Sequence, residues 1–447
     1  MEPFVIMLEV YLMKKMKKLL ALVLSLAMMA ALSACGSSSG TTDQPADNAT
    51  DGDAASDGVV ELEFWHCWSG GNADILNSIV DAFNASHENI HVTASYQGDY
   101  WEAASKAYSA VSTGEAPDLL MMGTDHVSIF MKEGGILENL VPYMDASGYN
   151  KDDLVPAFTN TYWGEDGGLY ALSFGRSVPV LYVNTDMLDQ VGASVPTTWD
   201  EVDEVSQKLI SAGVCEYGYA LPYDSQYFQM IVPQMGGKVW NETGDALGCI
   251  EDGTLAKGLQ MLQDQVNNKT LYYGPTQDSS STCRALFLDK KCAMYLHSVS
   301  NLAKIDSSAD FNYQVAFVPE GERASVNTGG CTVTMLSSSE YKDACWEFLQ
   351  WFITSDEGAV QICTQIGYLP FTYSMTESDA IKDLWERIPG SKTAFDEADQ
   401  IGEDSRNANT GDCLNTFMGA MEAVLYDNED VNTVVANLDE EVKNIIG

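Results

Sequence analysis

Residues 59–96, VVELEFWHCWSGGNADILNSIVDAFNASHENIHVTASY, decide the fold class of this chain. Residues 59–65 alternate apolar and polar side chains, as a half-buried strand does, and small residues follow at 69–71. The next large apolar side chains share one face of a helix: Leu76, Ile79, Val80 and Phe83. Residues 90–96 read as a second strand, so the segment predicts a strand–helix–strand unit, from which parallel sheets are built.

The same alternation of strands and helices continues along the chain. Residues 101–113 predict a helix, and residues 117–122 predict a short buried strand. Further strands are expected at 178–183, 292–296 and 311–318, and further helices at 340–354 and 356–366. This order is typical of α/β proteins whose parallel or mixed sheets are covered on both faces by helices.

Length and charge restrict the function classes. A chain of 447 residues is too long for one compact core, so two domains are expected. The 65 acidic and 23 basic residues give a formal net charge of −42. A surface this acidic repels nucleic acid and anionic lipid, so neither is an expected partner.

The N-terminus carries a targeting signal. Residues 1–34 place four lysines before an apolar stretch that is too short for a permanent membrane span, and they predict a signal peptide. Residues 32–35, Leu-Ser-Ala-Cys, match the bacterial lipobox, in which the cysteine is lipidated. The alternative is an ordinary signal peptide that ends in cysteine by chance. We expect lipidated Cys35, followed over residues 35–58 by a disordered acidic tether, to hold the protein on the extracellular face of the cell membrane.

Cysteine usage gives no sign of a metal site. Ten cysteines less Cys35 leave nine, and no Cys-x-x-Cys pair or zinc spacing occurs. Cys283 and Cys292 are close enough in sequence to bridge a short loop. Free buried thiols are the favoured interpretation.

No catalytic motif is found. The chain has no P-loop, no dinucleotide-binding glycine motif after a strand and no Gly-x-Ser-x-Gly elbow. The five histidines are scattered, and none is expected to bind a metal. A glycosidase needs two facing carboxylates, and the 65 acidic residues leave that alternative open. We expect a protein that is not an enzyme, and a secreted glycoside hydrolase is the alternative from another class.

Aromatic residues beside turns are the most informative functional signal. They are Trp68, Tyr100, Trp101, Trp163, Trp240 and Tyr368. Pyranose rings stack on aromatic planes while their hydroxyls form hydrogen bonds, so aromatic and short polar residues suit a neutral carbohydrate. The alternative for each aromatic residue is that it fills its own core. Trp346 and Trp351 lie in an amphipathic helix and are expected in the core.

Several short motifs together point to a family. They are Phe64-Trp65-His66, Tyr96-Gln97-Gly98-Asp99-Tyr100, Gly114-Glu115-Ala116-Pro117, residues 179–184, Cys292-Ala293-Met294, Gly329-Gly330 and Gly367-Tyr368-Leu369-Pro370. In this order and spacing the chain resembles the extracellular solute-binding proteins of carbohydrate-type ABC importers, and within them the glycerol-3-phosphate-binding branch.

The resemblance implies a two-lobed periplasmic-binding-protein-like fold of type II, with mixed sheets and a ligand cleft between the lobes. The expected first lobe is 59–175 plus 317–366, and the second is 176–316 plus 367–447. Such proteins act as monomers that capture a small molecule by hinge closure and deliver it to the permease subunits. No cofactor is expected.

Positions that match the ligand contacts of this family are Tyr100, Ser177, Ser298, Gly330 and Tyr368. An acidic contact of the family falls at Thr124 by direct count, so the adjacent Asp125 is the candidate. Trp68 and Trp240 are added as aromatic candidates.

The main departure from the family is a missing arginine. In the glycerol-3-phosphate branch an arginine of the second lobe helps to grip the ligand, and its position falls at Leu414 in this chain. Arg406, the only basic residue between Lys392 and Lys443, is the candidate ligand contact in its place if the loop follows a different path. A buried phosphate dianion needs charge-assisted partners. A neutral sugar or polyol is therefore the favoured ligand, with glycerol-3-phosphate or a glycerophosphodiester as the alternative.

Overall fold

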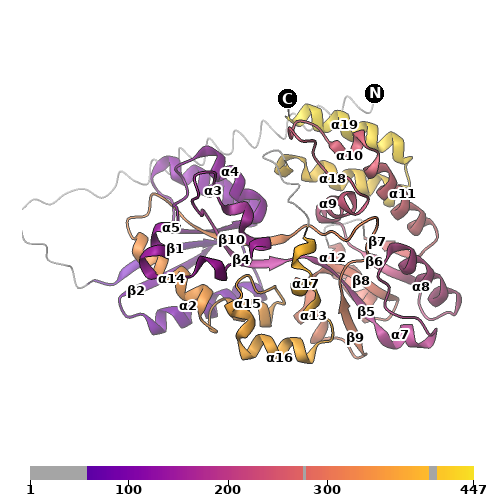
Figure 1. Ribbon diagram of the computed structural model, residues 1–447, viewed down its shortest axis with the longest axis horizontal. Helices are drawn as coiled ribbons and strands as arrows, with labels where there is room; N and C mark the ends of the chain where they lie inside the picture. Colours follow the sequence, from indigo (N-terminus) through magenta and orange to yellow (C-terminus); the bar gives the residue numbers. More distant parts are fainter. Residues whose placement is uncertain (1–57, 275–277, 402–409, 447) are drawn as a thin grey trace, which may run out of the picture. The chain divides into compact units, whose positions relative to one another are not determined.

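The computed structural model describes residues 58–274, 278–401 and 410–446, without the side chains of Asp125 and Asp399. Residues 58–447 cluster as one compact unit, and it contains two five-stranded mixed sheets with helices around each (Figure 1). We call each sheet with the helices packed on it a lobe. The predicted α/β two-lobed class is therefore confirmed.

The first sheet has the strand order β2-β1-β3-β10-β4. Its strands are β1 (Val60–His66), β2 (Ile90–Tyr96), β3 (Leu119–Gly123), β4 (Leu172–Ser177) and β10 (Gly329–Met335). The helices of this part of the chain are α2 (Gly71–Ser86), α3 (Tyr100–Thr113), α4 (Val127–Glu133), α5 (Val141–Ser147), α6 (Pro156–Thr159), α14 (Lys342–Thr354) and α15 (Ala359–Gln365). β1 is parallel to β2 and β3, and β10 is antiparallel to β3 and β4. The predicted strand–helix–strand unit at residues 59–96 is confirmed.

The core of the first lobe shows why its helices form where they do. The four apolar residues predicted to share a face of α2 are its buried residues. Behind β1 and β4, four phenylalanines pack together, and the Phe174 and Phe352 rings stack with centroids 4.3 Å apart. Phe64 contacts both Phe174 and Phe348. This aromatic cluster holds α14 against the sheet.

The second sheet has the strand order β7-β6-β8-β5-β9. Its strands are β5 (Pro179–Asn184), β6 (Tyr217–Leu221), β7 (Leu271–Tyr273), β8 (Cys292–Ser298) and β9 (Tyr313–Ala316). Its helices are α7 (Thr185–Gln190), α8 (Trp199–Ser211), α9 (Ser225–Gln234), α10 (Gly248–Glu251), α11 (Thr254–Asn267), α12 (Ser279–Leu288), α13 (Leu302–Asp306), α17 (Thr393–Asp396), α18 (Thr410–Leu425) and α19 (Val431–Ile446). A further helix, α16 (Asp379–Arg387), packs on α15 of the first lobe. α18 packs on α9, where the Phe417 and Phe228 rings stack at 4.4 Å.

The chain crosses between the sheets three times. β4 ends at Ser177 and β5 begins at Pro179; residues 317–328 connect β9 back to β10; and residues after 366 lead from α15 toward the second lobe. Arg176 is fully buried and links the crossings. Its guanidinium donates to the Tyr162 hydroxyl (2.5 Å) and to Thr328 Oγ1 (2.9 Å), and its carbonyl accepts from Leu369 N (2.8 Å).

Most local predictions agree with the structure. The expected strands and helices are present within three residues of their predicted bounds, whereas β4, β6, β7 and β10 were not expected. Nine cysteines of the described residues are free, Cys283 and Cys292 included, which confirms the interpretation as free thiols. The predicted lobe boundaries stay predictions, and residues 1–57, with Cys35, lie outside the described residues.

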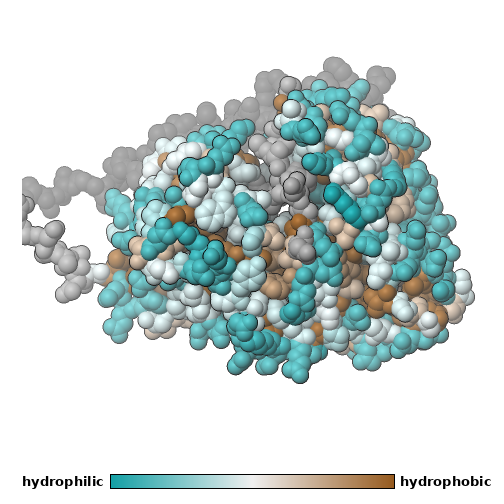
Figure 2. Space-filling view, in the orientation of Figure 1, coloured by the Kyte–Doolittle hydropathy of each residue, from teal (hydrophilic) through white to brown (hydrophobic). Residues whose placement is uncertain are grey.

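The polarity of the surface and the hydropathy of the helices are the last features of the fold to describe. Hydrophilic residues cover most of the face drawn in Figure 2, as the acidic composition leads one to expect. In the described part of the chain, no helix has both the length and the apolar character needed to cross a bilayer.

Candidate functional site

A cleft of about 320 Å³ lies between the two lobes. Its first-lobe wall comes from the start of α3 and from residues that follow β3, including Trp101 and His126. Its second-lobe wall comes from the start of α9 and the end of β8, including Gln226 and His297. Ligands of open α/β sheets bind outside the carboxyl ends of strands, which is where β3, β4 and β8 meet this cleft.

Five residues predicted to contact the ligand line this one cleft: Tyr100, Ser177, Ser298, Gly330 and Tyr368. They come from α3, the end of β4, the end of β8, the start of β10 and the third crossing. The side chain of Asp125 and all of Arg406 lie outside the described residues. Contact between these residues and a ligand stays a prediction.

Trp68 supports the cleft from behind. Its side chain is 4% exposed and is absent from the cleft lining, while its Nε1 donates to the Tyr100 hydroxyl at 3.1 Å. The indole ring stacks on Tyr368, with centroids 6.0 Å apart and planes inclined by 7°. Burial raises the pKa of both tyrosines, so their hydroxyls remain protonated and able to donate. Trp68 thus positions the two tyrosines that face the cleft.

Trp240 lies apart from the cleft. Its ring is 5% exposed, its Nε1 donates to Thr410 Oγ1 at 3.0 Å, and it contacts Phe417. Trp240 therefore packs in the second-lobe core, which is the alternative stated for each aromatic residue. Trp101 instead lines the cleft, with its ring 4.3 Å from that of His126. A side chain built at Gly411 would come within 3.0 Å of Trp101, so this indole also contacts α18 of the second lobe.

The cleft wall is polar and carries few charges. Among the described residues that line it, none is a lysine or arginine, and Asp224 is the one carboxylate. Leu414 lines the cleft at the position where the resemblance would place an arginine. Among the described residues, the buried Arg176 donates to the hydroxyl of Thr328, a lining residue.

His297 is held neutral in the wall. The Asn301 amide nitrogen lies 2.8 Å from Nδ1, so Nδ1 accepts and Nε2 donates to Ser280 Oγ, also at 2.8 Å. Burial is the main cause that lowers the pKa of His297 to about 3, and the nearby cations Arg284 and Lys304 lower it further. The ring is therefore a neutral part of the cleft wall, with both of its nitrogens paired inside the protein.

This lowered pKa predicts a specific loss of stability in acid. In the unfolded chain His297 protonates below its ordinary pKa of 6.5, whereas in the folded chain it stays neutral to about 3. Stability is thus present above pH 6.5 and is lost as the pH falls toward 3. His297→Gln should reduce the loss between pH 7 and pH 5 by about 2 kcal/mol in urea unfolding. At pH 8, where His297 is neutral in both states, the stability difference between the variant and the wild type measures the cost of the lost hydrogen bonds. If the free energy of unfolding falls equally with pH in both proteins, the prediction is contradicted.

Residues 87–91, HENIH, have the spacing of a zinc-binding His-Glu-x-x-His helix, although no histidine was expected to bind a metal. α2 ends at Ser86, so the two histidines do not share a helical face. His87 stacks on Phe83, and His91 on β2 pairs with Glu61 at 2.9 Å. No metal-binding cluster occurs among the described residues.

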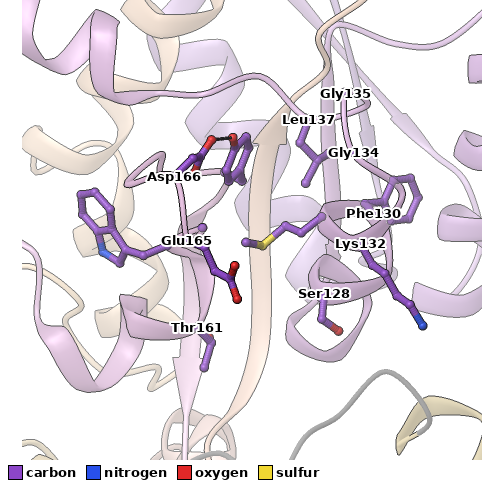
Figure 3. A pocket seen from close by; sticks show the side chains of 13 residues that line it. Ser128, Phe130, Lys132, Gly134, Gly135, Leu137, Thr161, Glu165 and Asp166 are labelled. Carbon is purple, nitrogen blue, oxygen red and sulfur yellow. Dashed lines mark hydrogen bonds between the residues drawn. The ribbon is translucent and has the colours of Figure 1, made fainter.

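A second hollow, of about 490 Å³, lies within the first lobe (Figure 3). Its walls come from α4 and from the segment that contains Trp163, and Glu165 points into it between Thr161 and Ser128. All of its lining residues fall between 128 and 170. The interlobe cleft contains the five positions that match the family's ligand contacts, and this hollow contains none of them, so the cleft is the better candidate site.

Comparisons with known proteins agree with this geometry. Residues 78–389 match the family model described as bacterial extracellular solute-binding protein. The sn-glycerol-3-phosphate-binding periplasmic protein UgpB of Pectobacterium atrosepticum is 27% identical over 368 residues, 76% of this chain and 80% of that protein. UgpB of Brucella melitensis is 25% identical over 404 residues, 84% of this chain and 91% of that protein.

Solved structures share the fold at low identity. The GacH receptor of Streptomyces glaucescens, solved unliganded and with acarbose, has a TM-score of 0.74 at 20% identity and covers 87% of this chain and 98% of its own. UgpB from Mycobacterium tuberculosis, solved in complex with glycerophosphocholine, has the same TM-score and identity and covers 87% and 99%. The family model spans well over half of the sequence. The chain therefore belongs to the bacterial extracellular solute-binding proteins.

Proposed function

We propose that this protein captures a neutral sugar or other small polyol in the interlobe cleft and delivers it to the permease of an ABC importer. The observation that carries the ligand class is the lining of the cleft. Tyrosine and tryptophan rings stand beside serine, threonine and amide groups, and none of the described lining residues is a lysine or arginine. Aromatic planes and neutral hydrogen-bonding groups suit a hydroxyl-rich ligand.

Hinge closure is the proposed mechanism. The cleft takes lining residues from both lobes and from the crossings between them, so a ligand makes its full set of contacts only when the lobes are together. A ligand that binds the closed form more tightly shifts the population toward it. The permease then recognises the closed form.

Glycerol-3-phosphate or a glycerophosphodiester is the second candidate ligand. It is favoured by the relatives, because several proteins 23–28% identical to this chain are named as glycerol-3-phosphate-binding. The lining argues for the neutral ligand: Leu414 supplies no charge, and the guanidinium of Arg176 donates to Tyr162 and Thr328.

The remaining parts of the proposal concern the state of the protein. Lipidation at Cys35 would anchor it to the extracellular face of the membrane, and the segment that follows would let the folded part reach the permease. We propose a monomer that leaves its ligand chemically unchanged. Membership of a solute-binding family supports the last point.

A thermal-shift screen tests the ligand class. The panel contains glucose, maltose, sorbitol, glycerol, sn-glycerol-3-phosphate and glycerophosphocholine. A ligand of the folded state raises the melting temperature progressively with log concentration above its Kd. A neutral compound should give the largest shift. A larger shift with either phosphate compound would favour the second candidate, and reducing sugar released from a glycan would favour a hydrolase.

Tyr100→Ala and Tyr368→Ala should each weaken binding of the best neutral compound by about 1–3 kcal/mol. Each substitution removes a ring that lines the cleft and is held there by Trp68. Isothermal titration calorimetry below the melting temperature measures the change. Tyr373→Ala, at a tyrosine that is 48% exposed and outside the cleft, is the matched control. Wild-type affinity in both cleft variants would remove these rings from the binding site.

A further inference from the structure

Two side-chain atoms in the cleft are buried without a hydrogen-bond partner in the described part of the chain. They are Nε2 of Gln226, a donor, and Oδ1 of Asn327, an acceptor. Both residues line the interlobe cleft. Buried polar atoms in folded proteins are nearly always paired, so two unpaired atoms in one cleft require an explanation.

Gln226 stands in the first turn of α9. Its backbone N–H donates to the Asp224 carboxylate at 2.8 Å, which fixes the start of the helix. The side-chain amide lies beside the start of β10, which follows the second crossing, because a Cβ built at Gly329 would be 3.5 Å from Nε2. The helix thus presents the amide donor of Gln226 to the cleft.

Asn327 lies on the second crossing, two residues before β10, and its neighbour Thr328 holds the backbone in place. Thr328 Oγ1 accepts from Arg176 Nη2 at 2.9 Å and donates to the Ser177 carbonyl at 3.2 Å. The acceptor Oδ1 of Asn327 is therefore carried by a segment that is tied to the first lobe. A donor on a second-lobe helix and an acceptor on the crossing segment share one cleft.

The chemistry of the pair selects among ligand groups. A hydroxyl donates one hydrogen bond and accepts others, so one hydroxyl or two neighbouring ones can satisfy both atoms. Ionised phosphate and carboxylate oxygens only accept, so they would satisfy Gln226 and leave Asn327 facing another acceptor. Unmet buried polar groups are costly, and this cost discriminates against a ligand that cannot pair with both.

We infer that Gln226 and Asn327 are specificity-determining residues that form hydrogen bonds with ligand hydroxyls, Gln226 as the donor and Asn327 as the acceptor. The inference rests on the proposed binding of a sugar or polyol in this cleft. It adds two contacts that the family resemblance did not supply. It also gives a physical reason for selecting hydroxyls over oxyanions that does not depend on a missing arginine.

The test uses the full mature chain and whichever of glucose, maltose, sorbitol and glycerol gives the largest thermal shift. Gln226→Met and Gln226→Glu both remove the donor, and Asn327→Leu removes the acceptor. Each should raise the Kd of that compound about 5- to 50-fold, since each leaves a buried hydroxyl group unpaired. Asn327→Asp keeps an acceptor of the same shape and should stay within about threefold of wild type. Gln260→Met, at an exposed glutamine on α11, is the matched control.

The ligand-free stability of the variants separates a binding role from a structural one. Because Nε2 and Oδ1 have no partner among the described residues, Gln226→Met and Asn327→Leu should melt at or above the wild-type temperature without ligand. If the two side chains had a structural role, these substitutions would lower the melting temperature of the ligand-free protein. Weaker binding together with unchanged or higher stability supports the inference. A drop in stability that accounts for the weaker binding overturns it.

The outcomes distinguish failure of the inference from failure of the proposed function. If wild-type protein binds a neutral compound and Gln226→Glu and Asn327→Leu bind it equally well, the inference is overturned and the proposed function stands. If wild-type protein binds none of the four neutral compounds, the proposed function is overturned and the inference with it. If Asn327→Asp and Asn327→Leu lose the same amount of affinity for the neutral compound, the acceptor role assigned to Asn327 is also overturned.

Discussion

Gly330→Ala should destabilise the folded protein by about 3–5 kcal/mol and abolish measurable binding in the cleft. Gly330 has a φ of +112°, a conformation that side-chain-bearing residues rarely adopt. An added Cβ would also lie 2.0 Å from the carbonyl oxygen of Gly175 on the neighbouring strand. That contact is with backbone, and Gly330 is paired with Arg176 in the β4–β10 ladder, so neither strand can withdraw without breaking the sheet beside the cleft.

A matched glycine separates the two causes. Gly114 ends α3 with a φ of +75°, and a Cβ built there would meet nothing within 4 Å. Gly114→Ala should therefore cost only the conformational penalty, about 1–2 kcal/mol. Urea unfolding measures both variants, and calorimetry with the best neutral compound measures binding. If Gly330→Ala proves no less stable than Gly114→Ala, the close contact with Gly175 does not govern this position.

Local periodicity predicted the strands that carry a clear pattern and missed those that do not. β1 and α2 show a two-residue and a 3.6-residue period, because each has one face toward the core. β3 and β5 are buried along their whole length and are marked by apolar runs, whereas β4 has the sequence LSFGRS, in which polar residues and a glycine interrupt the run. β10 begins with two glycines, and its partners β3 and β4 lie about 150 to 210 residues earlier in the chain. Pairing at that separation leaves no local signal.

The residues of the candidate site likewise divide into those that the sequence predicted and those that it could not. Trp68, Trp101 and Trp240 all stand beside turns, yet in the described structure only Trp101 lines the cleft. The sequence does not record which side of a turn faces the core. Gln226 and Asn327 were not singled out, because their interest comes from the partners they lack in the folded chain. The five positions that match the family's ligand contacts line one cleft. The order and spacing of the family motifs identified them, and their chemistry alone did not.

The two cleft tyrosines depend on a chain of aromatic contacts that starts in the first-lobe core. Phe174 is fully buried on β4 and stacks on Phe352 of α14 at 4.3 Å. The Trp68 ring packs edge-on against Phe174 at 5.4 Å and in turn stacks on Tyr368. Trp68 also donates to the hydroxyl of Tyr100. Packing in the core therefore sets the position of the two tyrosine rings that line the cleft.

Phe174→Ala should lower the free energy of unfolding by about 3–5 kcal/mol, since it removes a buried ring and leaves a cavity beneath Trp68. Because Trp68 would then tilt into the cavity, the affinity for the best neutral compound should fall as well. Phe174→Leu keeps most of the volume and should cost less than about 1.5 kcal/mol. Tyr426→Ala, at a tyrosine that is 60% exposed, should change stability by no more than about 0.5 kcal/mol. Urea unfolding and calorimetry on the three variants decide the matter: stability lost in Phe174→Ala with affinity fully retained would show that the tyrosines do not depend on this core.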